Sequence, residues 1–215
     1  MNKEFGLITE GPTDQVVIKH LLAKYFSNPD IDTRPVQPNK DATDIRAHFG
    51  GWGRVLEYCQ SPDMAKALQM FDFVIIQIDT DVCEEYGVSR RDGGEDCTDE
   101  QIILKTKNVI IQKIGPELFN LYKGKIIFAI SYESIECWLL PLYFNDHSRA
   151  KTKNCCEKLN QGLPKGGFTI DCNNKKPKYY EIICKNIRNK HQIDQISVHN
   201  NSFNHFVRTL AALSQ

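Results

Sequence analysis

Three short apolar segments that end close to acidic residues are the strongest constraint on the fold of this chain of 215 residues. They read FGLITE at residues 5–10, FVIIQI at residues 73–78 and KIIFAIS at residues 125–131. Stretches in which apolar residues recur at helical spacing lie between and after them. Continuous apolar strands that alternate with helices predict a parallel sheet that helices cover on both faces. We therefore expect one α/β domain.

Local signals place the other elements around these strands. The first helix should begin near Thr13, a good N-cap, and include Tyr25. A loop at 27–44 should contain one strand at 33–37, Gly50 to Gly53 should form a flexible loop, and the polar stretch at 83–98 should be mobile. Further helices are expected at 54–70, with an interruption near Pro62, and at 99–114, 134–144, 179–187 and 203–213.

Charge and hydropathy indicate where the protein acts and what kind of molecule it binds. No apolar run is long enough to span a bilayer, and the chain begins with polar residues rather than with a signal peptide, so we expect a cytoplasmic protein without a membrane partner. The net charge is zero, but residues 72–100 hold ten acids and two arginines, whereas residues 149–191 hold eleven Lys or Arg and three acids. An acidic centre beside a basic region suits an enzyme that acts on a polyanion; two solvated surfaces of opposite sign are the alternative.

The eight cysteines have no C-x-x-C spacing. In a cytoplasmic chain we expect reduced, partly buried thiols. A zinc site is a less favoured alternative, and its candidate ligands are Cys155, Cys156, Cys172 and Cys184.

Acidic residues follow all three expected strands. Glu10 and Asp14 come after the first, Asp79 and Asp81 after the second, and Glu133 and Glu136 after the third. The carboxyl ends of parallel strands share one edge of a sheet, where ligands bind. Several carboxylates at one edge predict a site for a hard cation such as Mg²⁺ or Mn²⁺.

The segments ITEGPTD and IIQIDTDV resemble the two signatures of the TOPRIM domain, which topoisomerases, primases and several nucleases share. The details are most similar to its nuclease branch, related to the overcoming-lysogenisation-defect (OLD) family, and to small stand-alone TOPRIM proteins of abortive-infection systems. In these proteins a block like SIECWLL often comes third, and an end like SFNHFVRTL is usual. The motifs are short, but their order spans most of the chain. The resemblance implies a TOPRIM-like catalytic domain at 1–145 and a basic helical extension at 146–215 packed on the same domain.

The resemblance also implies roles for individual residues. Two metal ions would be held by Glu10, Asp14, Asp79 and Asp81. The catalytic set would be Glu10, Asp79, Asp81 and Glu136, with Glu133 as the rival of Glu136. Nucleic acid would contact Gly11, Lys175, Lys176 and Lys178.

These roles lead to the expectation of a Mg²⁺-dependent or Mn²⁺-dependent endonuclease that cuts DNA or RNA as the toxic effector of an anti-phage system. No Walker motif is present, so any ATPase would be a separate chain. The protein could act as a monomer or as a homo-oligomer. One alternative is a transferase in which Asp79 and Asp81 hold a nucleotide-sugar through Mn²⁺; this leaves Glu10 and Asp14 unused. Another is a non-catalytic module that binds a partner.

Overall fold

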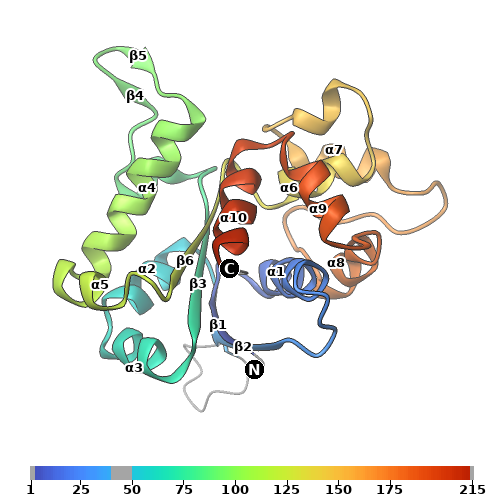
Figure 1. Ribbon diagram of the computed structural model, residues 1–215. Helices are drawn as coiled ribbons and strands as arrows, with labels where there is room; N and C mark the ends of the chain where they lie inside the picture. The colour runs from blue at the N-terminus through green and yellow to red at the C-terminus, as the bar shows by residue number, and fades with distance from the viewer. Residues whose placement is uncertain (1–2, 40–49, 214–215) are drawn as a thin grey trace.

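A four-stranded parallel sheet lies between two layers of helices (Figure 1). The computed structural model describes residues 3–39 and 50–213. The strands follow the order β2-β1-β3-β6, and their bounds are β1 Glu4–Ile8, β2 Asp32–Gln37, β3 Phe73–Asp79 and β6 Ile126–Ser131. All three predicted apolar segments form strands, and the predicted parallel sheet with helices on both faces is confirmed.

The strands are apolar on both faces because both faces are covered. Phe5 and Leu7 of β1 join the core under one helical layer, whereas Ile8 joins the core under the other. Between them, Gly6 leaves room for Phe71: a Cβ at this position would lie 2.5 Å from the Phe71 ring. The continuous apolar pattern therefore reflects two separate hydrophobic cores, one on each side of the sheet.

One layer consists of α2 Trp52–Gln60, α3 Pro62–Met70, α4 Asp99–Ile114 and α5 Pro116–Tyr122. The other consists of α1 Pro12–Tyr25, α6 Glu136–Leu139, α7 Cys155–Gly162, α8 Pro177–Cys184, α9 Lys190–Ser197 and α10 Asn201–Ala212. Short 3₁₀ helices lie at Cys83–Tyr86, Leu140–Leu142 and His147–Ala150. The basic C-terminal helices therefore share one core with α1.

Local sequence signals explain several helix boundaries. Proline occupies the first turn of α1, α3, α5 and α8, where its missing N–H costs nothing. Thr98 and Gln101 form a reciprocal capping box at the start of α4. Gly115 ends that helix with a φ of 88°, a conformation that glycine adopts readily. The break predicted near Pro62 is present, since Ser61 separates α2 from α3.

The structure differs from the sequence-based expectation in several short elements. The stretch at 83–98 contains a 3₁₀ helix and a small hairpin of β4 Arg91–Asp92 and β5 Glu95–Asp96. The helices α5, α7 and α9 were not predicted; each has eight residues or fewer, so its apolar periodicity is short. Residues 40–44 of the predicted loop lie outside the described residues. None of the described helices is long and apolar enough to cross a membrane.

Four cysteines form disulfides, which corrects the expectation of reduced thiols. Cys137 of α6 pairs with Cys155 of α7, and Cys156 pairs with Cys172. The folded chain brings the paired Cα atoms within 5.1 and 5.9 Å, a range typical of disulfides, although 18 and 16 residues separate them in the sequence. Spacing alone does not reveal such pairs. The free cysteines among the described residues are Cys59, Cys83, Cys97 and Cys184.

Candidate active site

The predicted acids of the first two strands meet at the carboxyl edge of the sheet. Glu10 follows β1, Asp14 lies in the first turn of α1, and Asp79 ends β3. The Asp79 backbone N–H donates a hydrogen bond of 2.7 Å to Oε1 of Glu10. Asp14 and Asp79 are buried, whereas Asp81, two residues further on, is exposed.

Gln77 connects the two strands and was missed by the sequence-based prediction. Its side-chain amide donates to Oδ1 of Asp79 at 2.8 Å, and its carbonyl oxygen accepts from the Glu10 N–H at 3.0 Å. The side chain is fully buried. The available signal was its position as the one polar residue inside the apolar run FVIIQI. Gln77 therefore fixes the relative position of two site acids.

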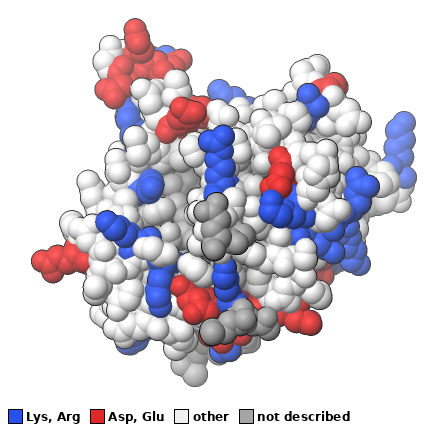
Figure 2. All heavy atoms as spheres, viewed as in Figure 1, with Lys and Arg blue, Asp and Glu red and all other residues white. Residues whose placement is uncertain are grey.

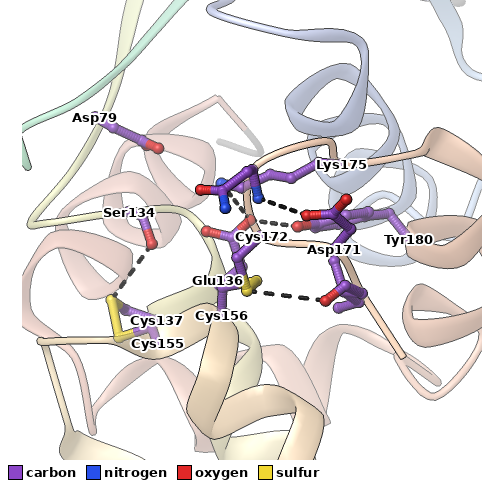
Figure 3. A network of polar contacts seen from close by, with 12 residues as sticks. Asp79, Ser134, Glu136, Cys137, Cys155, Cys156, Asp171, Cys172, Lys175 and Tyr180 are labelled. Atoms are coloured by element: carbon purple, nitrogen blue, oxygen red, sulfur yellow. Dashed lines mark hydrogen bonds and ion pairs between the residues drawn. A yellow bond between two sulfur atoms is a disulfide. The ribbon is translucent and has the colours of Figure 1, made fainter. Parts of the chain in front are cut away.

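A second group of site residues surrounds Glu136, the first residue of α6 (Figure 3). Glu136 is fully buried, and its Oε1 lies 2.7 Å from the Lys175 ammonium and accepts a hydrogen bond from the Tyr180 hydroxyl. Figure 3 shows these three side chains pointing toward one another from separate segments. The other oxygen, Oε2, is buried without a hydrogen-bond partner among the described residues. The contact of Tyr180 with Glu136 was missed by the sequence-based prediction.

Burial and mutual repulsion shift the acids toward their protonated forms. Burial raises the pKa of Glu10 to about 8. The hydrogen bond from the Asp79 N–H opposes this increase, and the negative charges of Asp14 and Asp81 add to it. Burial and the charge of Glu136 raise the pKa of Asp14 to about 7. The pKa of Asp79 is raised well above its usual range, mainly by burial and then by Glu10. The excess of negative charge therefore requires protons or a cation.

Lys175 supplies the buried positive charge of the site. Burial alone would lower its pKa, but the charges of Glu136 and Asp79 outweigh this and raise it. Burial likewise disfavours the charged form of Glu136, yet Lys175 and Tyr180 hold its pKa below the ordinary value. Glu136 and Lys175 therefore form an ion pair in which both groups are charged at neutral pH.

The other residues implied by the resemblance lie at the margin. Glu133, the rival of Glu136, forms an ion pair of 2.8 Å with Arg90. Lys176 is exposed and donates to the Asn174 side chain, and Lys178 lies over the Tyr179 ring. Of the three lysines, the structure brings only Lys175 to the acids.

Two glycines closely approach the acidic residues. Gly11 precedes α1, and a Cβ there would lie 3.1 Å from Oδ2 of Asp14. The Gly51 N–H donates to the Glu10 carbonyl at 2.6 Å, and a Cβ on Gly50 would lie 1.9 Å from that oxygen. Gly50 therefore packs against the backbone of a site acid in a space that only glycine fits. The expected flexible loop at Gly50 to Gly53 is only partly present, because Trp52 and Gly53 begin α2.

The donor chemistry fits a hard divalent cation. Carboxylate oxygens are the preferred ligands of Mg²⁺ and Mn²⁺. The buried Glu136 Oε2 and the raised pKa values of Glu10 and Asp14 indicate that the site has less positive charge than its carboxylates need. Hydrogen bonds within the described part of the chain engage Oε1 of Glu10 and Oδ1 of Asp79. In the same part of the chain, no three Asp, Glu, His or Cys side chains stand in a ready-made metal-binding arrangement. Binding would therefore require side-chain adjustment.

The site combines converging acids, a buried ammonium and glycine-lined backbone at one edge of the sheet. Such an arrangement can attract a divalent cation through the acids and an anionic group through Lys175. Comparison of the chain with protein-family models, curated proteins and solved structures found no match.

Proposed function

We propose that this protein is a metal-dependent nuclease that hydrolyses phosphodiester bonds of DNA or RNA. The observation that carries the proposal is the convergence of Glu10, Asp79 and Glu136 from three neighbouring strand ends, with Lys175 paired to Glu136. Residues that are far apart in the sequence contribute to one site, and they include the acids on which the TOPRIM resemblance rests. This convergence supports a shared chemical role.

The ligands of one or two Mg²⁺ or Mn²⁺ ions would be Glu10, Asp14, Asp79 and Asp81. When bound, such ions polarise a phosphoryl oxygen and stabilise the attacking and leaving oxygens of the reaction.

The chain's own residues perform the other tasks. Gln77 and Tyr180 donate hydrogen bonds that fix the orientation of the Asp79 and Glu136 carboxylates. Lys175 is charged at neutral pH and can neutralise an approaching phosphate. Glu10 could instead act as a general acid or base: without a bound metal its pKa is about 8, so its carboxyl group can gain or lose a proton near neutral pH. A phosphodiester at this edge would meet both proton-transfer and charge-neutralising groups.

The biological setting is proposed from the resemblance. By analogy with abortive-infection TOPRIM proteins, the nuclease would be a cytoplasmic toxin of an anti-phage system, and this location would require the two disulfides to persist in a reducing compartment. An ATPase, if required, would be a separate subunit, and the active form would be a monomer or a homo-oligomer.

The nuclease explains more of the site than the alternatives do. A Mn²⁺-dependent nucleotide-sugar transferase would use Asp79 and Asp81, but would leave the packing of Glu10 and Asp14 against them without a role. A non-catalytic module would leave the charged Lys175–Glu136 pair beside the other acids equally unexplained.

The test is a cleavage assay with purified protein and plasmid, single-stranded DNA and tRNA, with Mg²⁺, Mn²⁺ or a chelator. The wild type should cleave at least one substrate only with metal, and Glu10→Gln and Asp79→Asn should each lose at least a hundredfold in rate. Asp63→Asn, which changes an exposed acid of α3, is the matched control and should retain activity. Full activity of both site variants would refute the nuclease, and metal-dependent hydrolysis of a nucleotide-sugar would favour the transferase.

A further inference from the structure

A cavity of about 440 Å³ lies at the far end of α1 from the acids. One side of it comes from the last turns of α1 and the following loop, and the other from the turn between α8 and α9. The residues that line it are Lys19, His20, Ala23, Lys24, Ser27, Pro29, Arg188 and Asn189. Three of them carry a full positive charge, and none is acidic.

Two of the three cations of this cavity have no ion-pair partner among the described residues. Lys24 and Arg188 form no ion pair or hydrogen bond through their side chains with the rest of the described chain. Lys19 differs, because it also borders a second cavity that Glu4, Asp30 and Asp32 line. Lys24 and Arg188 are therefore the two cations of the cavity that an anionic ligand could pair with without displacing an acidic side chain.

Further positive charge surrounds the cavity. The groups whose charges act on His20 are Glu181, Lys19, Lys24 and Lys185, so three cations and one acid surround this imidazole. Figure 2 shows Lys and Arg gathered at the right of the view, where Figure 1 places α8, whereas Asp and Glu gather on the β4–β5 hairpin at the upper left. A polyanion would be attracted to the α1–α8 side and repelled by the hairpin.

The distance between the cavity and the acids corresponds to a few nucleotides of a nucleic-acid strand. Asp14 and Lys24 are about ten residues apart on one helix, which corresponds to about 15 Å at the rise of an α-helix. One strand of a duplex advances about 3.4 Å per nucleotide, so this span covers roughly four nucleotides. Helix α8 packs beside α1, and Lys175 lies two residues before the start of α8, so basic residues extend from the site toward the cavity.

We propose that the cavity formed by Lys24, Arg188 and their neighbours binds backbone phosphates of the nucleic-acid substrate a few nucleotides from the bond that is cut. This inference rests on the proposed function and adds a second contact point to it. The cavity holds the strand by charge, so it contributes affinity and register but no sequence preference.

The test measures binding of labelled oligonucleotides by fluorescence anisotropy at several salt concentrations, with Ca²⁺ in place of Mg²⁺ to suppress cleavage. The variants are Lys24→Ala/Arg188→Ala and, as a matched control, Lys66→Ala/Lys113→Ala, which removes two lysines from α3 and α4 on the opposite face of the sheet. Melting temperatures verify that each variant folds. Oligonucleotides of about 2 and about 16 nucleotides separate binding at the acids from binding that reaches the cavity, since about four nucleotides are needed to span the distance.

If the cavity binds phosphates, the double variant should flatten the slope of log affinity against log salt by about 1.4–1.8 for the long oligonucleotide. The short one and the control variant should be unaffected. An unchanged slope in a folded double variant overturns the cavity as a contact and leaves the nuclease standing. Absence of nucleic-acid binding by the wild type overturns both. Inorganic pyrophosphate that raises the melting temperature through Lys24 and Arg188, without an effect of oligonucleotide length, would show a small-molecule site instead.

Discussion

Glu10 and Asp14 differ from surface carboxyls because burial opposes their ionisation. The pKa values of about 8 and about 7 lie well above the ordinary 4.5 and 3.8. Between these limits the folded chain binds more protons than the unfolded chain. The stability that these protons provide is fully present below about pH 4 and is lost as the pH rises through about 7 and 8.

Glu10→Gln should remove its share of this pH dependence. Without divalent metal, the free energy of unfolding of the variant should rise relative to that of the wild type between pH 5 and pH 8, because the wild type must ionise a buried acid and glutamine need not. Urea denaturation at pH 5, 6, 7 and 8 measures the difference. A difference that is independent of pH would show that Glu10 titrates normally in the folded chain.

Lys175 should matter for stability as well as for cleavage. Lys175→Met leaves Glu136 buried beside Tyr180 without its cation, and an unpaired buried charge costs about 3 kcal/mol. The second change in Lys175→Met/Glu136→Gln should restore most of this stability but not the cleavage. Lys176→Met is the control, because the Lys176 side chain is exposed and donates to the Asn174 side chain rather than to a site acid. Equal destabilisation by both lysine variants would contradict the buried pair.

At the scale of elements, the segment between α7 and α8 carries Lys175 but contains no helix or strand. Two attachments near its middle hold it in place. Cys172 is bonded to Cys156, and the Asn160 side chain makes hydrogen bonds of 2.9 and 2.8 Å to the carbonyl and N–H of Ile170. The position of Lys175 therefore depends on covalent and polar contacts rather than on regular secondary structure.

Reduction should consequently weaken this part of the molecule. Closing a loop of this length with a disulfide stabilises by about 3 kcal/mol, so dithiothreitol should lower the melting temperature of the wild type. Cys172→Ser should have a lower melting temperature without reductant and respond less to its addition, whereas Cys97→Ser should respond as the wild type does. A count of eight reactive thiols in unreduced, denatured protein would rule out both disulfides, and stoichiometric zinc would favour a metal site at these cysteines.

The same elements show what could be predicted from the sequence. Strands β1, β3 and β6 were predictable because continuous apolar runs mark them, and α4 was predictable because its apolar residues recur at helical spacing. The acids of the site were predictable because they lie at or within a few residues of the carboxyl ends of strands. Gln77 and Tyr180 were not, since their roles depend on partners from other segments. The short helices α7 and α9 bury only three and two residues, too few to establish a period.

At the scale of the whole molecule, binding of metal should stabilise the fold. A cation that binds only the folded chain adds about 2.7 kcal/mol at a hundredfold excess over its dissociation constant. Mg²⁺ or Mn²⁺ should therefore raise the melting temperature of the wild type at pH 7.5. Asp79→Asn should abolish this rise, and Asp63→Asn should retain it. An equal rise in both variants would indicate that the metal binds elsewhere.

The contact between the two ends of the described chain has a consequence for biosynthesis. The Lys3 side chain donates to the Leu213 carbonyl, and the Trp138 ring stacks on Phe203 and Phe206 of α10 at 5.1 and 5.4 Å. Until α10 leaves the ribosome, Trp138 lacks these partners, and α6, which carries both Trp138 and Glu136, lacks much of its support. A nascent chain can pair β1 with β3 long before it can complete this packing. If the chain is a toxic nuclease, translation itself delays its activity until α10 has been made.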